Sequence, residues 1–96
     1  MAFIFEWDGE KARRNLEKHG VSFEEAKTVF EDPLAQILDD EDHSSDEARE
    51  IIIGQSDAER LLFVSFTERR ENLIRIVSAR KATAIERRDH EEGKAH

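Results

Sequence analysis

Short apolar stretches alternate with polar, turn-forming segments along the whole 96-residue chain. Some of these stretches have the length and residue types of strands, and others have apolar residues at helical spacing or a strongly helix-forming composition. The predicted strands cover residues 3–7, 34–38, 49–54, 61–67 and 73–79, and the predicted helices cover residues 9–19, 22–31 and 82–90. The expected order of elements is therefore β-α-α-β-β-β-β-α.

Capping residues mark where the first two helices begin and end. Asp8 is a good N-cap for the first helix, and Gly20 suits a left-handed C-cap. Ser22 and Glu25 form a capping-box pattern at the start of the second helix, which the Pro33 region ends. The second helix has apolar residues at helical spacing that are expected to face the core, namely Phe23, Ala26, Val29 and Phe30.

This order of elements predicts an α+β fold. The strands form an antiparallel sheet, and the helices lie mainly on one face of it. A chain of this length supports one hydrophobic core. We therefore expect a single domain over residues 1–90 and a frayed tail at residues 91–96.

The last predicted strand carries two arginines within an apolar run, residues 74–81. A guanidinium is costly to bury without a partner, and it keeps its charge at every physiological pH. Each arginine therefore needs an anion, either a carboxylate of the protein or a bound phosphate. Strand alternation places Arg75 away from the core, on the same face as Arg69. Arg80 has the parity of Ile76, which suits the core, but it falls at the strand end, where the chain can turn it outward, and a β-bulge would also reverse its direction.

Charge is distributed unevenly along the chain. The net charge of −8 argues by itself against a protein that binds nucleic acid. Residues 1–59 contain 6 basic and 17 acidic side chains, whereas residues 60–88 contain 8 basic and 3 acidic ones. The strand with the two arginines thus lies in the basic part of an acidic protein, where a local positive surface can bind phosphate.

Several classes of protein are excluded by what the sequence lacks. The chain contains no cysteine, which rules out disulfides and thiolate metal sites. Its apolar runs are too short to cross a bilayer, and its N-terminus has no signal-like segment. We therefore expect a cytoplasmic protein without membrane contact.

A series of short motifs follows in order along residues 5–88. The motifs are Phe5-Glu6-Trp7-Asp8, Asn15, Lys18-His19-Gly20, Val21-Ser22-Phe23-Glu24-Glu25-Ala26, Val29-Phe30-Glu31-Asp32-Pro33, Asp42-His43-Ser44, Glu47, Arg49, Gly54, Phe66-Thr67, Arg69, Ile74-Arg75-Ile76-Val77-Ser78-Ala79-Arg80 and Glu86-Arg87-Arg88. Together they resemble the BrnT family of bacterial toxins, RelE-like ribonucleases of type II toxin–antitoxin systems. The chain departs from the family pattern at His90, where a tyrosine is expected.

The resemblance implies a RelE-like fold and a metal-independent endoribonuclease that cleaves RNA and arrests translation. It also implies a cognate BrnA-like antitoxin with a ribbon-helix-helix DNA-binding domain. This antitoxin would neutralise the toxin in a heterotetramer or larger complex, and the toxin would reach DNA only through it.

RNA cleavage without metal needs a base for the 2′-hydroxyl, cations for the phosphorane and an acid for the leaving 5′-oxygen. Histidine titrates in a suitable range, and arginine engages two phosphate oxygens at once. The candidate catalytic residues are Lys18, His19, Glu47, Arg49, Arg69 and Arg80, and the candidate RNA-binding residues are Arg69, Arg70, Arg75, Arg80 and Lys81.

Structural interpretations and other functions stay open. His19 lies where a helix C-cap is expected, and the arginines can instead pair with Glu47, Glu68 or Glu71. One alternative function is a non-catalytic co-repressor that binds the antitoxin. Another is a metal-dependent hydrolase that uses the acidic residues Asp39, Asp40 and Asp42 with His43. Their spacing matches neither a calcium loop nor a zincin helix, and we expect no cofactor.

Overall fold

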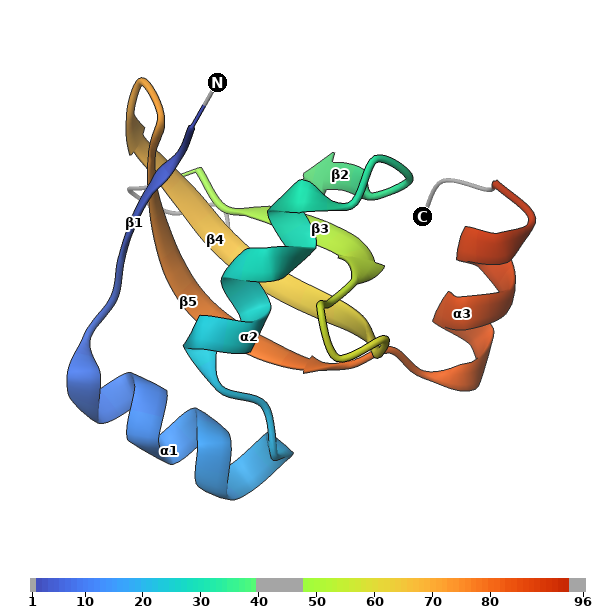
Figure 1. The fold of residues 1–96 in the computed structure, drawn as a ribbon, viewed down its shortest axis with the longest axis horizontal. Coiled ribbons are helices and arrows are strands. Elements are labelled where there is room, and N and C mark those ends of the chain that lie inside the picture. The colour runs from blue at the N-terminus through green and yellow to red at the C-terminus, as the bar shows by residue number, and fades with distance from the viewer. Residues whose placement is uncertain (1, 40–47, 94–96) are drawn as a thin grey trace.

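The computed structural model describes residues 2–39 and 48–93 (Figure 1). The elements within these ranges are, in chain order, β1 (Ile4–Glu6), α1 (Gly9–His19), α2 (Phe23–Thr28), η1 (Val29–Glu31, a 3₁₀ helix), β2 (Gln36–Asp39), β3 (Glu50–Gln55), β4 (Leu61–Arg70), β5 (Leu73–Lys81) and α3 (Ala84–Glu91). The predicted α+β class and the predicted order of elements are confirmed. Helix α3 extends to Glu91, one residue into the predicted tail.

The strands form one sheet in the order β1-β5-β4-β3-β2. Strands β2 to β5 pair antiparallel, as expected. Strand β1 instead pairs in parallel with β5, so the sheet is mixed rather than purely antiparallel. Almost the whole chain separates β1 from β5, so no tight hairpin forces these two strands to run in opposite directions. The RelE-like relationship of this sheet stays a prediction.

The predicted caps define helices α1 and α2. The Asp8 carboxylate accepts hydrogen bonds from two backbone N–H groups of the first turn of α1, at 2.8 and 3.0 Å. Gly20 ends α1 in the left-handed conformation, with a φ of 70°. Ser22 Oγ accepts a hydrogen bond from the backbone N–H of Glu25 at 3.0 Å. These bonds satisfy groups that a helix leaves unpaired at its ends.

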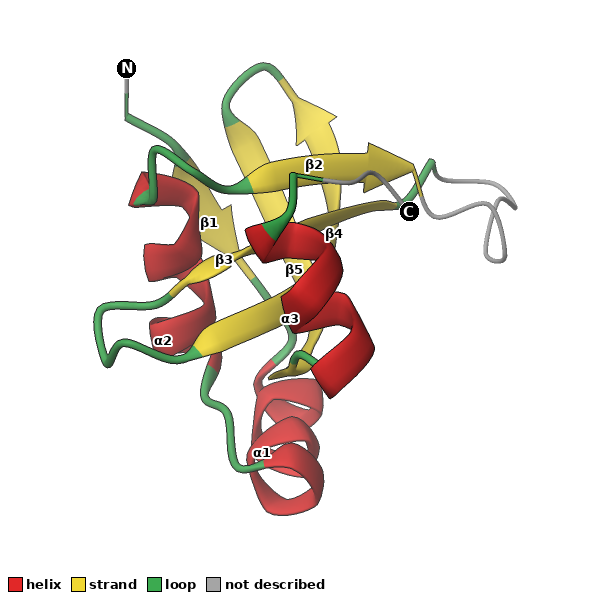
Figure 2. Ribbon diagram, turned by 90° about the vertical axis from the view of Figure 1, so that its right-hand side faces the viewer, coloured by secondary structure: helices red, strands yellow, loops and turns green. Residues whose placement is uncertain are grey.

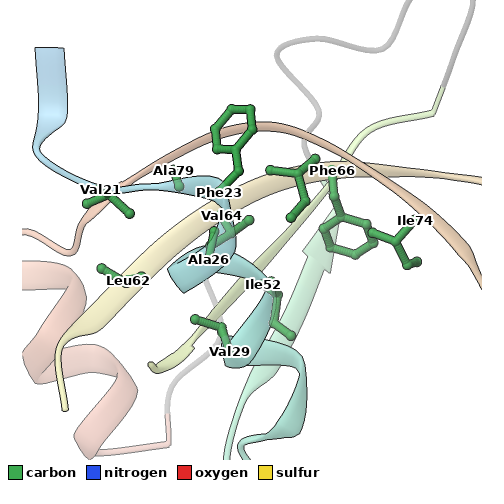
Figure 3. Close-up of a cluster of buried hydrophobic side chains, with 11 residues drawn as sticks. Val21, Phe23, Ala26, Val29, Ile52, Leu62, Val64, Phe66, Ile74 and Ala79 are labelled. Carbon is green, nitrogen blue, oxygen red and sulfur yellow. The ribbon is translucent and has the colours of Figure 1, made fainter. Parts of the chain in front are cut away.

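Helix α2 and η1 pack across one face of the sheet, which we call the core face (Figure 3). Side chains of β3, β4 and β5 point to this face, and the segment from the end of α1 to η1 covers them. The cluster consists of Val21, Phe23, Ala26, Val29, Ile52, Leu62, Val64, Phe66, Ile74, Ile76 and Ala79, each at most 3% exposed. Removal of this apolar surface from water is the main contribution to folding.

A β-bulge in the β4–β5 pair changes which β5 side chains face the core. Val77 has no partner on β4, because Ile76 and Ser78 pair with adjacent β4 residues. The extra residue shifts the alternation by one position, so Ala79 rather than Arg80 faces the core. The expectation that Arg80 shares the parity of Ile76 is therefore wrong, and the bulge rather than the strand end turns its side chain outward. Arg80 lies on the opposite face, as does the other arginine of the strand.

Helix α3 lies over the opposite face of the sheet from α2 (Figure 2). Its Glu86 contacts Arg80, and its His90 lies 3.4 Å from Gln36 of β2. The helices lie mainly on the core face, as expected, but α3 partly covers the face that we expected to be open. No helix within residues 2–39 and 48–93 is long and apolar enough to cross a membrane.

Candidate nucleic-acid interface

The face of β4 and β5 opposite the core carries both arginines of β5, and we call it the arginine face. Its residues are Phe63, Ser65 and Thr67 of β4 and Arg75, Ser78 and Arg80 of β5. The register pairs each β4 residue with one β5 residue: Thr67 with Arg75, Ser65 with Ser78 and Phe63 with Arg80. The bulge at Val77 makes this arrangement possible, because without it Arg80 would point into the core.

Arg75 has an internal carboxylate partner on the neighbouring strand. The parallel pairing of β1 with β5 places Glu6 beside Arg75, and Glu6 Oε2 lies 3.0 Å from Arg75 Nη1. The two side chains are 38% and 34% exposed. A single contact between half-exposed groups is weak, so an incoming phosphate can compete for Arg75.

Arg80 is held more firmly than Arg75. Its Nη1 and Nη2 atoms donate to the two carboxylate oxygens of Glu86 at 2.8 and 2.9 Å. Its guanidinium also stacks on Phe63, with Cζ 4.0 Å from the ring centroid. The hydrogen bonds with Glu86 raise the pKa of Arg80, and those with Arg80 lower the pKa of Glu86. A phosphate that binds Arg80 in a bidentate manner must first displace Glu86.

The partners of both arginines differ from those expected. Sequence reasoning named Glu47, Glu68 and Glu71, whereas the structure pairs the arginines with Glu6 and Glu86. Glu6 comes from the far end of the chain, and Glu86 comes from the helix that folds back over the sheet.

Two buried hydroxyl groups lie between the arginines on the arginine face. Ser65 Oγ and Thr67 Oγ1 are fully buried and have no hydrogen-bond partner in the described part of the chain. A buried hydroxyl without a partner costs free energy, on the order of 1–3 kcal/mol. Such groups are rare in folded proteins and are typical of places where a ligand or a water supplies the missing bond.

A basic groove runs beside the arginine face, between α1 and β5, and we call it the α1 groove. It has a volume of about 330 Å³ and is lined by Lys11, Arg14, Asn15, Lys18, His19, Val77 and Ser78. Ser78 belongs to both the groove and the arginine face, so the two surfaces are continuous. Among the described residues, Lys11 and Lys18 have no ion-pair partner, and Arg14 has only a 3.4 Å contact with an exposed glutamate of its own helix.

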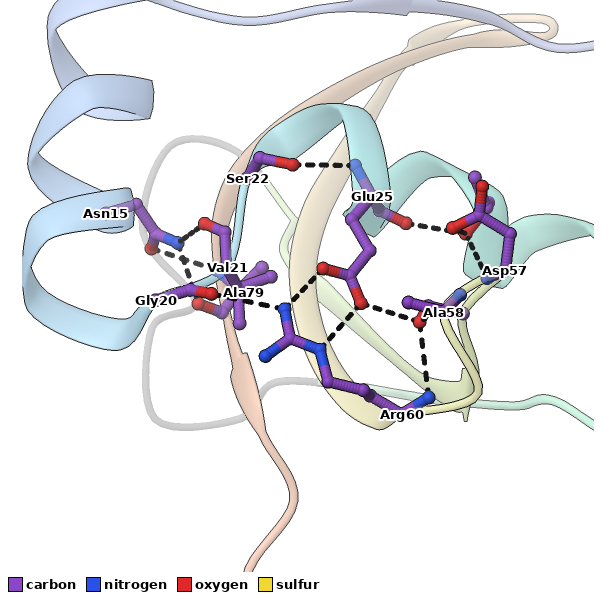
Figure 4. Close-up of polar contacts among 11 residues, drawn as sticks. Asn15, Gly20, Val21, Ser22, Glu25, Asp57, Ala58, Arg60 and Ala79 are labelled. Carbon is purple, nitrogen blue, oxygen red and sulfur yellow. Dashed lines mark hydrogen bonds and ion pairs between the residues drawn. The ribbon is translucent and has the colours of Figure 1, made fainter.

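A buried asparagine fixes α1 against β5 and so builds the α1 groove (Figure 4). Asn15 Nδ2 donates to the carbonyl oxygens of Val21 (2.9 Å) and Ala79 (2.8 Å), and its Oδ1 accepts from the N–H of Ala79 at 3.1 Å. The amide side chain thus replaces a neighbouring strand at the edge of β5. It also leaves the basic residues of α1 on the side next to Ser78.

A second network of polar contacts holds the turn that follows α1. Arg60 donates to the carbonyl oxygen of Gly20 at 3.1 Å and forms an ion pair with Glu25 of α2 (Figure 4). Ser56 Oγ donates to the same carboxylate at 2.6 Å. The hydrogen bonds from Arg60 lower the pKa of Glu25 despite partial burial. The position of His19 at the end of α1 therefore depends on a network that sequence reasoning did not identify.

The structure brings some of the predicted site residues together and separates others. Lys18 and His19 lie in the α1 groove, next to the face that holds Arg75 and Arg80. Lys81 pairs with Leu62, a core-face residue, so it does not share the arginine face. Arg69 and Arg70 are exposed at the hairpin, at the opposite end of β5 from Arg80, and Arg49 is half-buried before β3. Glu47 lies outside the described residues.

Three residues of this surface were missed from the sequence: Lys11, Arg14 and Ser78. Lys11, Arg14 and Lys18 recur at helical spacing within the predicted first helix, which was the signal that marked one basic side of it. Ser78 had no such signal, because its exposure depends on the bulge.

No cluster of three metal-ligating side chains occurs within residues 2–39 and 48–93. Three of the four proposed metal ligands, Asp40, Asp42 and His43, lie outside these ranges. His90, where the family pattern has a tyrosine, lies on α3 near Gln36 and away from the α1 groove.

Comparison with known proteins identifies a matching family and a similar solved structure. The family described as the ribonuclease toxin BrnT of type II toxin–antitoxin systems matches residues 7–86. The 1.1 Å crystal structure of the Brucella abortus ribonuclease toxin BrnT is similar, with a TM-score of 0.62 and 22% sequence identity over 86% of this chain and 97% of that one. This likeness shows the fold. No curated protein matches the chain.

Proposed function

Because the chain belongs to the BrnT family of ribonuclease toxins of type II toxin–antitoxin systems, we propose that it is a metal-independent endoribonuclease that arrests translation by cutting RNA. In this proposal the 2′-hydroxyl of the substrate attacks the adjacent phosphorus, and the 5′-oxygen leaves. The protein acts in the cytoplasm and uses no cofactor.

The α1 groove carries this proposal. Within residues 2–39 and 48–93 it offers two lysines without an ion-pair partner, Lys11 and Lys18, beside a histidine, at the edge of a sheet face that bears two further arginines. Lys11, Arg14 and Lys18 would hold backbone phosphates, and His19 would exchange the proton with the 2′-hydroxyl or the 5′-oxygen. An imidazole suits either role, because it can both accept and donate a proton.

The arginine face would supply charge to the phosphorane. Arg75 would turn from Glu6 to the phosphate, and Arg80 would exchange Glu86 for it; both retain a full positive charge for the purpose. The hydroxyls of Ser65 and Thr67 would then gain partners as the side chains above them move. Glu47, Arg49 and Arg69 remain proposed catalytic residues, and Arg70 and Lys81 remain proposed RNA contacts outside this surface.

The family also indicates the partners. A ribonuclease toxin of a type II toxin–antitoxin system implies an antitoxin partner and an RNA substrate. We further propose that the antitoxin is of the BrnA-like ribbon-helix-helix type, that it forms a heterotetramer or a larger complex with the toxin, and that the complex binds DNA through the antitoxin.

Primer extension on RNA treated with the purified toxin, in the presence of EDTA, tests the activity. We expect cleavage by the wild type and a loss of at least about 100-fold for His19→Ala, as for removal of a general acid or base. Lys18→Gln should weaken RNA binding. It should also reduce the slope of the logarithm of the binding constant against the logarithm of the salt concentration by about 0.7, as for the loss of one phosphate contact with single-stranded RNA.

A matched pair of variants separates the two interpretations of Arg80. Arg80→Ala removes the cation, whereas Glu86→Gln removes the ion pair but keeps the cation. If Arg80 binds phosphate, Arg80→Ala loses cleavage and Glu86→Gln keeps it. Equal losses in both variants would assign Arg80 to the attachment of α3. Cleavage that disappears in EDTA would instead favour the metal-dependent alternative.

A second function is favoured by one observation: both arginines of β5 already have carboxylate partners. A protein that keeps these pairs closed would be a non-catalytic partner of the antitoxin and its co-repressor. Wild-type protein that cleaves no RNA and leaves growth unaffected, but increases the affinity of the antitoxin for operator DNA, would establish this function.

A further inference from the structure

A second hollow lies on the core face, at the end of the sheet that α2 and η1 leave uncovered. It has a volume of about 360 Å³, and we call it the acidic cleft. The residues that define it are Phe3, Phe30, Ile37, Glu50, Phe66 and Glu68. Its floor is the end of the hydrophobic core, because Phe66 belongs to the core cluster.

The walls of the acidic cleft expose apolar side chains to water. Ile37 of β2 is 56% exposed and Phe3 is 41% exposed. Phe3 meets Phe30 edge to face, with the ring centroids 5.8 Å apart, so the aromatic wall is already in place without a ligand. Apolar surface gathered in a preformed hollow is typical of sites that bind another molecule.

In the described part of the chain, the two glutamates of the acidic cleft lack a cation that would neutralise them. Glu50 and Glu68 form no ion pair with any residue that the structure describes. Strand pairing also places Asp39 directly opposite Glu50. Burial is the main cause that raises the pKa of Glu50, and repulsion from Asp39 and Glu68 adds to the effect. The free protein thus keeps negative charges close together in a partly buried place, where a cation would be strongly attracted.

Charge selects among the possible occupants of the acidic cleft. RNA carries one negative charge per nucleotide and is repelled by the carboxylates. A second copy of this chain brings a net charge of −8 and is disfavoured for the same reason. The cleft is complementary to a protein segment that combines apolar side chains with lysine or arginine.

We propose that the acidic cleft is where the antitoxin docks, through a segment whose apolar side chains enter the hollow and whose lysine or arginine side chains pair with Glu50 and Glu68. This inference rests on the proposed function, since it takes the antitoxin as the partner. The cleft and the arginine face lie on opposite faces of the same strands. The antitoxin can therefore bind here without occupying the α1 groove.

The test uses the protein encoded by the reading frame next to the toxin gene as the ligand, with affinity measured by titration calorimetry at low and high salt. Glu68→Lys reverses a charge at the cleft and Glu24→Lys reverses one on α2, and both positions are exposed. We expect Glu68→Lys to raise Kd at least about tenfold and to reduce its salt dependence, and Glu24→Lys to change Kd less than about twofold.

An apolar pair of variants completes the design. Ile37→Ser removes an exposed apolar residue of the cleft, and Ile85→Ser removes one of α3, where the side chain is 64% exposed. The first should raise Kd about tenfold and the second should leave it unchanged. Both variants, like Glu68→Lys, should cleave RNA at the rate of the wild type.

Three results would contradict the inference, and each has a different meaning. Wild-type binding that Glu68→Lys and Ile37→Ser leave intact, while Arg75→Ala weakens it, would move the antitoxin to the arginine face and overturn the inference alone. No binding by the wild type would overturn both the antitoxin pairing and this inference. Self-association of the wild type that Ile37→Ser abolishes would assign the cleft to a second copy and also overturn the inference.

Discussion

The two faces of the sheet carry opposite charges, and these charges differ in whether they already have a partner. On the arginine face, Arg75 and Arg80 lie 3.0 and 2.8 Å from internal carboxylates. In the acidic cleft, on the other side of the same strands, Glu50 and Glu68 have no cationic partner in the described part of the chain. Whether a surface is positive or negative therefore does not tell whether its charged groups are free to bind a ligand. A ligand of the arginine face must displace a carboxylate, whereas a ligand of the cleft supplies a missing partner.

The largest expected effect concerns which face holds the fold together. Phe66 lies on the core face and is 3% exposed, and the centroid of its ring lies 5.0 Å from that of Phe30. Phe63 instead lies on the arginine face, where the Arg80 guanidinium stacks on its ring. We expect Phe66→Ala to lower the free energy of unfolding by about 3–5 kcal/mol and Phe63→Ala to lower it by about 1–2 kcal/mol. Urea denaturation followed by circular dichroism measures both values. Equal losses would contradict the division of the sheet into a core face and a surface face.

The next effect concerns the attachment of the α1 groove to the arginine face. Asn15→Ala removes three hydrogen bonds and leaves the buried N–H and carbonyl groups of Ala79 without partners. We expect the free energy of unfolding to fall by about 2–4 kcal/mol. Leu16→Ala, at a neighbouring position that is 51% exposed, should cost less than about 1 kcal/mol. If both variants melt at the same temperature, Asn15 does not hold α1 in place.

A smaller effect tests whether the ion pair of Arg80 contributes to stability. The hydrogen bonds from Arg80 lower the pKa of Glu86 below 4.5, so its contribution is complete above that pH and is lost as the pH falls through the pKa of the folded state. Glu86→Gln keeps a side chain that can serve the capping box. We expect it to lower the free energy of unfolding by about 0.5–1 kcal/mol at pH 7 and to have no effect at acidic pH, where Glu86 is protonated. The same loss at both pH values would contradict the ionic interpretation.

The smallest effect has the opposite sign and comes from the acidic cleft. Burial and two neighbouring carboxylates raise the pKa of Glu50 above 4.5. The folded state therefore becomes less stable as the pH rises through the raised pKa and Glu50 ionises. Glu50→Gln should stabilise the free protein at pH 7 by about 0.5 kcal/mol and should lose this advantage at acidic pH. Thermal melts at both pH values, with the exposed Glu24→Gln as the control, measure the difference. A destabilised Glu50→Gln protein would mean that Glu50 has a favourable partner.

Much of the fold follows from local signals in the sequence. The bounds of α1 agree with the prediction because Asp8 and Gly20 satisfy its ends, and the core residues of α2 and β4 follow their periodicities. The parallel β1–β5 pairing and the position of α3 depend on contacts between distant segments, which no local pattern encodes. The site was harder to predict, since one extra residue at Val77 reverses the direction of Arg80. Residue types pointed to the cations, but only the register showed which of them share a surface.

The parallel pairing of β1 with β5 also has a consequence for the order of events during synthesis. Glu6 and Arg75 are 69 positions apart, and Asn15 and Ala79 are 64 positions apart. The first strand and the first helix therefore leave the ribosome long before their partners exist, and such distant pairings form slowly. A nascent chain that has not yet reached β5 has neither an arginine face nor an α1 groove. Whatever damage this protein can do to RNA, it becomes able to do it only when its own translation is nearly complete.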